Sequence, residues 1–210
     1  PSMMAAVRNP FASATFARSA PRLPDLPPDE GRELAFAGRS NAGKSSAINA
    51  LTGVAGLART SRTPGRTQQL VVFDLDARHR LIDLPGYGYA KVPVAMRAQW
   101  GQELGRYFRE RQSLVGLVLV MDCRHPLKDS DWLLLEACAD RGLPAMALLT
   151  KADKLGRNQQ QTLLREVRAR LAEGGALVAA RLFSATRPVA LEAIRNELGA
   201  WLFKDVAPAP

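Results

Sequence analysis

Apolar residues along this chain follow two different spacings, and the two kinds of segment alternate. Nearly continuous apolar runs, which are typical of strands buried in a sheet, occur at 33–38, 69–77, 78–84, 114–122, 144–150 and 176–185. Amphipathic segments, which are typical of helices that cover a sheet, begin at Lys44 and occur at 93–112, 129–142, 158–175 and 188–203. Asp129 or Ser130 is expected to cap the third helix, and Gly142 to end it.

This order predicts an α/β fold with a mostly parallel sheet and helices on both faces. The runs at 69–77 and 78–84 are joined by a tight turn, so they form a hairpin and predict one antiparallel edge strand. Residues 1–30 are rich in proline, and we expect them to form a flexible, extended segment outside the core. The folded domain should therefore span 31–205, followed by a frayed tail at 206–210.

Ligands of such sheets bind at the carboxyl ends of the strands, which directs attention to the segments that follow each strand. The first of these segments reads GRSNAGKS at 38–45 and fits the pattern G-x4-G-K-[ST] between a strand and a helix. Its two glycines let the backbone curl, so that N–H groups and the helix N-terminus face a phosphate. Lys44 is expected to reach the β- and γ-phosphates, and the Ser45 hydroxyl to bind Mg²⁺. The predicted nucleotide contacts here are Gly38, Arg39, Ser40, Asn41, Ala42, Gly43, Lys44, Ser45 and Ser46.

A second motif, TKAD at 150–153, follows a buried strand and selects among nucleotides. Asp153 can accept hydrogen bonds from N1–H and the exocyclic amine of guanine, a pair of donors that adenine does not offer in that arrangement. This favours GTP and GDP as ligands over the ATP of a P-loop kinase or ATPase. Lys151 is expected to lie along the base and brace the phosphate loop. The predicted base contacts are Thr150, Lys151, Ala152 and Asp153, with Phe183, Ser184 and Ala185 around the SAT stretch at 184–186.

In this order and spacing, GRSNAGKSS, RTPGRTQ, DLPGYGYA and TKAD resemble the EngB (YihA/YsxC) family of bacterial ribosome-biogenesis GTPases over residues 31–205. The resemblance implies a Ras-like G domain with a six-stranded sheet, mostly parallel and with one antiparallel edge strand. It also implies a Mg²⁺-dependent GTPase that assists assembly of the large ribosomal subunit and supports normal cell division and septation. The competing interpretation is a GTP-gated interaction protein of the division apparatus that makes no contact with RNA.

Two switch segments should sense the γ-phosphate, at 57–68 and from Asp83 onward. Their predicted nucleotide contacts are Gly65, Arg66, Thr67, Asp83, Leu84, Pro85 and Gly86. The predicted Mg²⁺ ligands are Ser45, Thr67 and Asp83; related GTPases with a TPGxT loop use the second threonine, and Thr63 is the alternative to Thr67.

Tyr87 occupies the position at which many nucleotide hydrolases carry a glutamine that orients water. Packing within the switch is the favoured role for this tyrosine, so intrinsic hydrolysis should be slow, at about 10⁻⁴–10⁻³ per second. The predicted catalytic residues are Lys44, Thr67, Gly86 and Asn41. Asn41 resembles the asparagine that coordinates K⁺ in some relatives, although it can instead shape the loop by bonding its own backbone. The ribosomal partner is the other candidate source of the missing catalytic group.

The positive net charge of the chain indicates the kind of partner that it binds. Lys and Arg outnumber Asp and Glu by 29 to 20, giving a net charge of +9, which suits a polyanion such as rRNA. Basic residues adjoin both switches and are the predicted rRNA contacts: Arg59, Arg62 and Arg66 lie in the first switch, Lys91 and Arg97 follow the second, and Arg106, Arg109 and Arg111 lie along the next helix. The two cysteines have no metal-binding spacing and are expected to be reduced and buried. No apolar run reaches the roughly 18–20 residues of a membrane-spanning helix, and we expect a cytoplasmic monomer.

Overall fold

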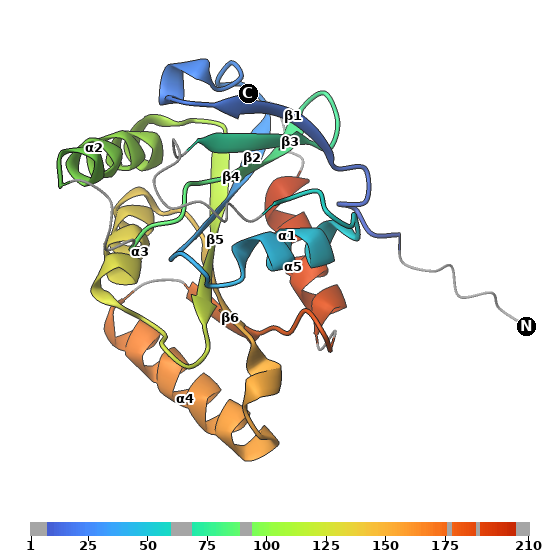
Figure 1. Ribbon diagram of the computed structural model, residues 1–210, viewed down its shortest axis with the longest axis vertical. Helices are drawn as coiled ribbons and strands as arrows, with labels where there is room; N and C mark the ends of the chain where they lie inside the picture. The colour runs from blue at the N-terminus through green and yellow to red at the C-terminus, as the bar shows by residue number, and fades with distance from the viewer. Residues whose placement is uncertain (1–7, 60–68, 89–93, 176–177, 188–189, 205–210) are drawn as a thin grey trace, which may run out of the picture.

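The computed structural model describes residues 8–59, 69–88, 94–175, 178–187 and 190–204. A seven-stranded sheet lies between two layers of helices (Figure 1). The strands are β1 (Thr15–Ala20), β2 (Arg32–Gly38), β3 (Leu70–Asp74), β4 (His79–Asp83), β5 (Leu114–Asp122), β6 (Ala145–Thr150) and β7 (Val178–Leu182). The helices are α1 (Lys44–Thr52), α2 (Val94–Glu110), α3 (Asp129–Arg141), α4 (Arg157–Glu173) and α5 (Leu191–Leu202), with short 3-10 turns η1 (Leu23–Asp25) and η2 (Ala152–Lys154).

The sheet confirms the predicted α/β class and corrects the number of strands. Its order is β1-β3-β4-β2-β5-β6-β7, with parallel pairing from β4 through β7. β3 runs antiparallel to β4, as the hairpin predicted. However, β3 is not an edge strand, because β1 pairs with its other side, also antiparallel. The expected six strands with an antiparallel edge are therefore seven strands, with β1 at that edge.

The extra strand comes from residues predicted to lie outside the core, and for the described part of 1–30 that prediction is wrong. Phe11 is fully buried and packs with residues of α1 and α5. The Asn9 amide donates to the carbonyls of Leu51 and Thr52, the last residues of α1, at 3.1 and 3.0 Å. Proline disfavours long α-helices here, but it does not exclude an extended chain that pairs with an open sheet edge.

The helices cover the two faces of the sheet with two separate apolar clusters (Figure 1). α1 and α5 cover one face, through residues such as Ile48 and Leu198. α2, α3 and α4 cover the other, through residues such as Phe108, Leu135 and Val167. β5 is buried on both faces, which explains its almost wholly apolar sequence.

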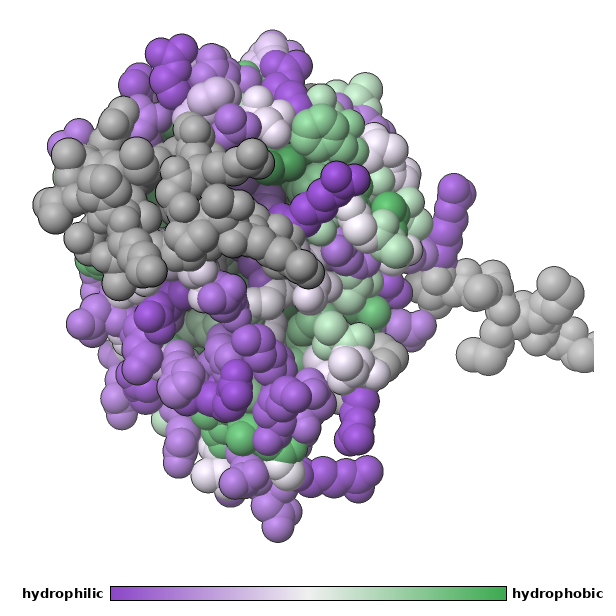
Figure 2. Space-filling model, viewed as in Figure 1, coloured by the Kyte–Doolittle hydropathy of each residue, from purple (hydrophilic) through white to green (hydrophobic). Residues whose placement is uncertain are grey.

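The outer faces of these helices are polar. Figure 2 shows that hydrophilic side chains predominate over α4 on the face in view. In the described part of the chain, no helix combines the length and apolar character needed to cross a membrane. Cys123 and Cys138 are free and buried, as expected, and burial raises the pKa of the Cys138 thiol to about 12.

The start of α3 differs by one residue from the prediction. Lys128, not Asp129 or Ser130, is the N-cap, and its extended backbone precedes the first helical residue. The Asp131 carboxylate accepts the Lys128 backbone N–H at 2.9 Å, so a side chain inside the first turn closes the helix end. Asp131 is fully buried, although its position in a polar stretch gives no sign of burial.

A buried carboxylate ties together the end of the sheet opposite the carboxyl ends of the parallel strands. Glu33, near the start of β2, has no exposed surface. It accepts hydrogen bonds from Tyr107 Oη at 2.9 Å, from Arg80 Nε at 3.0 Å, and from Arg111 Nε and Nη2 at 2.9 and 3.1 Å. Burial, followed by the Glu33 charge, raises the pKa of Tyr107 well above its ordinary value, so its hydroxyl remains a donor.

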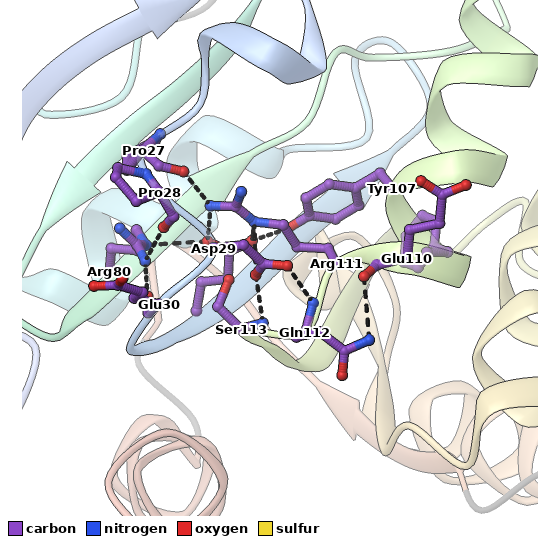
Figure 3. Close-up of polar contacts among 12 residues, drawn as sticks. Pro27, Pro28, Asp29, Glu30, Arg80, Tyr107, Glu110, Arg111, Gln112 and Ser113 are labelled. Carbon is purple, nitrogen blue, oxygen red and sulfur yellow. Dashed lines mark hydrogen bonds and ion pairs between the residues drawn. The ribbon is translucent and has the colours of Figure 1, made fainter.

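The same cluster holds the N-terminal segment in place (Figure 3). Arg111 also donates to the Pro27 carbonyl at 2.9 Å, and Asp29 accepts the backbone N–H groups of Gln112 and Ser113 at 2.9 and 2.7 Å. β2, β4, the C-terminal end of α2 and residues 27–30 are therefore joined through charged groups. Such a cluster is stable only while each charge keeps its partners.

We expect Arg111→Ala to lower the free energy of unfolding by about 3 kcal/mol, because it removes two hydrogen bonds from the buried Glu33 carboxylate. Urea denaturation measures this loss. The matched control is Arg106→Ala on the same helix, whose pair with Glu110 is exposed and should contribute less than about 0.5 kcal/mol. Equal losses for the two variants would contradict the role of Arg111 as an anchor.

Candidate functional site

The segments that carry the motifs meet at the carboxyl ends of five neighbouring strands. β2 leads into the loop 38–45, β4 into 83–88, β5 into 122–126, β6 into 150–154 and β7 into 183–187. These strands are consecutive in the sheet, in the order β4-β2-β5-β6-β7. Residues that are far apart in sequence thereby form one edge, as the parallel topology requires.

The loop 38–45 has the backbone of an anion cradle. At Gly38 a side chain would have its Cβ only 2.7 Å from the Val120 carbonyl oxygen, so this close approach to β5 requires glycine. Gly43, with φ 92°, is left-handed and immediately precedes α1, whose N-terminus carries unpaired N–H groups. Ser40 Oγ is buried and has no hydrogen-bond partner within the described ranges, which fits a polar ligand in the loop.

Two charged residues, Lys44 at the start of α1 and Asp83 at the end of β4, form an ion pair across the site. Asp83 is 7% exposed, and its burial raises the pKa of the carboxyl, against the opposing effect of the Lys44 charge. Ser45 follows directly in the first turn of α1, partly exposed, and Ser46 is exposed. A cation, two hydroxyls and a carboxylate therefore lie around the mouth of the phosphate loop.

The TKAD segment braces the phosphate loop, as the sequence predicted for Lys151. Lys151 Nζ donates to the Asn41 carbonyl at 2.7 Å. Thr150 Oγ1 is buried, donates to the Met121 carbonyl at 3.0 Å and also bonds the Ala42 carbonyl. The end of β6 and the phosphate loop are thus joined by two side chains, Thr150 and Lys151.

Asp153 lies beside the SAT stretch. Ser184 Oγ donates to Asp153 Oδ1 at 2.7 Å, and this hydrogen bond is the largest of the effects that lower the pKa of Asp153. The Ala152 N–H donates to the Phe183 carbonyl at 3.1 Å, which joins η2 to the end of β7. Ala185 follows Ser184 and is exposed. An ionised carboxylate with a fixed orientation is what recognition of two guanine donors requires.

Two further residues, Asp122 and Gln160, support this region, and neither was singled out by a motif in the sequence. Asp122 Oδ2 lies 3.1 Å from Lys151 Nζ and 2.7 Å from Arg124 Nη2, so it fixes Lys151 from the side opposite Asn41. Gln160 Nε2 donates to the Ala152 carbonyl at 2.7 Å. Asp122 falls at the end of an apolar strand, which is the general position of site residues, but its partners are known only from the fold.

A pocket of about 280 Å³ adjoins the outer side of the phosphate loop. It is lined by Arg39, Ser40, Asn41, Ala42, Met121, Asp122, Arg124, His125, Asp131 and Lys151. The lining joins the phosphate loop to the ends of β5 and β6 and to the start of α3.

The start of the second switch lies against the phosphate loop. The Leu84 N–H continues the sheet by donating to the Phe36 carbonyl at 2.9 Å, and Pro85 is buried behind it. The Ser40 N–H donates to the Tyr87 carbonyl at 2.8 Å, and the Tyr87 N–H to the Gly38 carbonyl at 3.3 Å. Gly86 is held between these contacts. The Tyr87 ring packs on the apolar cluster under α2 and α3, which agrees with a packing role.

Several predicted residues lie outside the described part of the chain. These are the first-switch residues Thr63, Gly65, Arg66 and Thr67, with Arg62 of the predicted rRNA surface. Lys91 is also outside it, and the side chain of Arg97 is not described. Within the described residues, Arg59, Arg106 and Arg109 are exposed. Arg111 was predicted to contact rRNA, but this is wrong, because its guanidinium is 11% exposed and bonds Glu33.

Comparison with known proteins gives one consistent result. A family model described as "50S ribosome-binding GTPase" matches residues 33–151. A "Probable GTP-binding protein EngB" from Stenotrophomonas maltophilia is 54% identical over 190 residues, covering 90% of this chain and 95% of that protein. The protein of the same name from Nitrosococcus oceani is 52% identical over 192 residues, covering 91% and 96%.

Solved structures of lower identity share the fold. The crystal structure of a probable GTP-binding protein engB has a TM-score of 0.65 at 21% identity, covering 82% of this chain and 100% of that one. Era, crystallised with MgGDPNP and a segment of 16S ribosomal RNA, has a TM-score of 0.59 at 18% identity, covering 86% of this chain and 60% of that one.

The geometry of Asp153 leads to a test of base recognition. Asp153→Ala should weaken GDP binding by about 100-fold or more, because guanine N1–H and its amine lose their acceptor. Titration with a fluorescent GDP measures this. Asp140→Ala, at an exposed position near the end of α3, is the control and should leave the affinity unchanged. A GDP affinity within threefold of the unmodified protein for Asp153→Ala would rule out the assignment.

Proposed function

We propose that this chain, which belongs to the EngB family of GTP-binding proteins, is a GTPase that acts as an assembly switch on the large ribosomal subunit. GTP hydrolysis is the activity of the family and of the matched domain. The ribosomal role and its timing are the parts that we propose. The observation that carries them is the match of residues 33–151 to a model whose description names the 50S subunit.

The site suits a switch better than a fast catalyst. Tyr87, at the position of a water-orienting glutamine, has its hydroxyl bonded to Asp131 of α3 and its ring packed on the core. We infer that no side chain at this position orients the attacking water, so turnover without a partner is slow, about 10⁻⁴–10⁻³ per second. The GTP state would bind the subunit and hydrolysis would release it.

Mg²⁺ fits the residues that surround the phosphate loop. Asp83 is a buried carboxylate whose partner in this structure is the Lys44 ammonium, and Ser45 lies beside them at the start of α1. These two oxygen donors would hold the ion together with Thr67 of the first switch. When bound, the ion neutralises charge on the β- and γ-phosphates. Lys44 then remains free to contact the phosphates, and Gly86 to offer its N–H to the γ-phosphate.

K⁺ is the proposed source of the missing positive charge. Asn41 is left-handed, with φ 63°, a conformation that asparagine adopts more readily than most residues. Its carbonyl is engaged by Lys151, which fixes the backbone and leaves the side-chain amide oxygen as the candidate K⁺ ligand. A cation between the β- and γ-phosphates would take the place of an arginine finger.

The positive surface supports binding to rRNA. The net charge is +9, and exposed arginines lie in the first switch (Arg59) and on α2, the helix after the second switch (Arg109). Phosphate contacts of this kind would place binding under nucleotide control, because the switches adjoin them. A requirement for division and septation would follow from the supply of ribosomes. The alternative to this proposal is a direct role at the division apparatus that involves no contact with RNA.

Hydrolysis of GTP should be faster in KCl than in NaCl at equal ionic strength, by about tenfold, and Asn41→Ala should abolish the difference. Phosphate release under single-turnover conditions measures both rates. Equal rates in the two salts would exclude K⁺ and leave the ribosomal partner as the source of the catalytic group.

Purified large ribosomal subunits should co-sediment with the protein bound to a non-hydrolysable GTP analogue. They should not do so with the GDP complex or the nucleotide-free protein. Binding should weaken steeply as salt increases. Absence of binding in all three states, at low and moderate salt, would remove the ribosomal role while leaving the GTPase chemistry intact.

A further inference from the structure

The Tyr87 side chain makes a specific contact that neither hydrolysis nor ribosome binding requires. Its hydroxyl donates to Asp131 Oδ1 at 2.5 Å, a length typical of a hydrogen bond to an ionised carboxylate. Burial, followed by the Asp131 charge, raises the pKa of Tyr87, so the hydroxyl keeps its proton and remains the donor. The contact joins the second switch to α3, elements that are 44 residues apart in sequence.

The α3 end of this contact is fixed. Asp131 is fully buried, and its other oxygen accepts the Lys128 N–H at 2.9 Å, which closes the start of the helix. α3 itself packs on the sheet through the buried residues Leu135 and Cys138. The Arg39 side chain lines the same pocket as Asp131. Burial raises the pKa of the Asp131 carboxyl, and the hydrogen bonds from Tyr87 and the Lys128 N–H, together with the Arg39 charge, oppose this rise.

The other end acts on Gly86. The Tyr87 backbone is bonded on both sides to the phosphate loop, through the Ser40 N–H and the Gly38 carbonyl. A Cβ at Gly86 would lie 3.6 Å from the Ser40 nitrogen and 3.7 Å from the Gly38 oxygen, so Gly86 rests against the loop. A side chain fixed at its tip and a backbone fixed at two points leave Gly86 little freedom.

We propose that Tyr87 and Asp131 are positioning residues that hold Gly86 in place for the γ-phosphate. A donor that is ordered before the ligand arrives binds it without the entropy cost of ordering, so the contact favours GTP over GDP. GDP has no γ-phosphate and gains nothing from this order. At the position where other nucleotide hydrolases carry a water-orienting glutamine, Tyr87 thus holds the second switch in place.

The test compares two affinities in the full chain. Tyr87→Phe removes a single oxygen atom and keeps the ring, whereas Asp131→Asn removes the charge. Each should weaken binding of a non-hydrolysable GTP analogue by about five- to twentyfold and change GDP binding by less than twofold. Asp129→Asn, exposed in the same helical turn, is the matched control and should change neither.

The double variant should bind the GTP analogue no more weakly than Tyr87→Phe alone, because Tyr87→Phe already removes the whole contact that Asp131→Asn weakens. Equal weakening of GDP and the GTP analogue would show a merely structural role and overturn the proposal. Unchanged affinities, or additive losses in the double variant, would also overturn it. If Asp131→Asn does not fold, Tyr87→Phe decides alone. The proposal depends on GTP binding and not on the ribosome, so its failure would leave the co-sedimentation test unaffected.

Discussion

The Glu33 carboxylate is the interaction on which the arrangement of the switch elements depends. It is fully buried, and its donors come from β4, α2 and the residue after α2. β2, which carries Glu33, ends in the phosphate loop, and β4 ends in the second switch. The partners of a buried charge are held in position, because moving one of them away would leave the carboxylate buried and unpaired, which is strongly destabilising. The far end of the switch machinery is therefore fixed.

Within the described residues, the opposite end of the same elements is held by hydrogen bonds and not by a buried ionic cluster. The C-terminal end of α2 is held by Tyr107 and Arg111 through their bonds to Glu33. At the opposite end, contacts between backbone groups and the Tyr87–Asp131 hydrogen bond join the switch to the phosphate loop and α3. These can break singly and at modest cost, unlike a buried ionic cluster. The molecule thus combines a rigid ionic cluster around Glu33 with weaker hydrogen bonds around Tyr87, beside the phosphate loop.

This division fits the slow, switch-like GTPase proposed above. The phosphate loop, Lys44 and Asp83 gather the groups expected to bind the nucleotide, and the Tyr87 side chain is engaged by the core and by Asp131. In the proposed role, a long-lived GTP state would give time for association with a large partner, and an external cation or the partner itself would then set the rate of release. Binding, not turnover, is the property that the geometry favours.

The sequence by itself determined the α/β class, the five main helices and the positions of the phosphate loop and the TKAD segment. Those features depend on local periodicity and on motifs whose geometry is set by a few neighbouring residues. Only the tertiary structure decided that residues 15–20 form a seventh strand, that Arg111 binds Glu33 and not solvent, and that Asp131 is buried against Tyr87. Each of these is a contact between distant segments, and a polar or proline-rich stretch carries no local sign of the partner that will cover it. The physical reason is that burial of a charge is a property of the assembled fold.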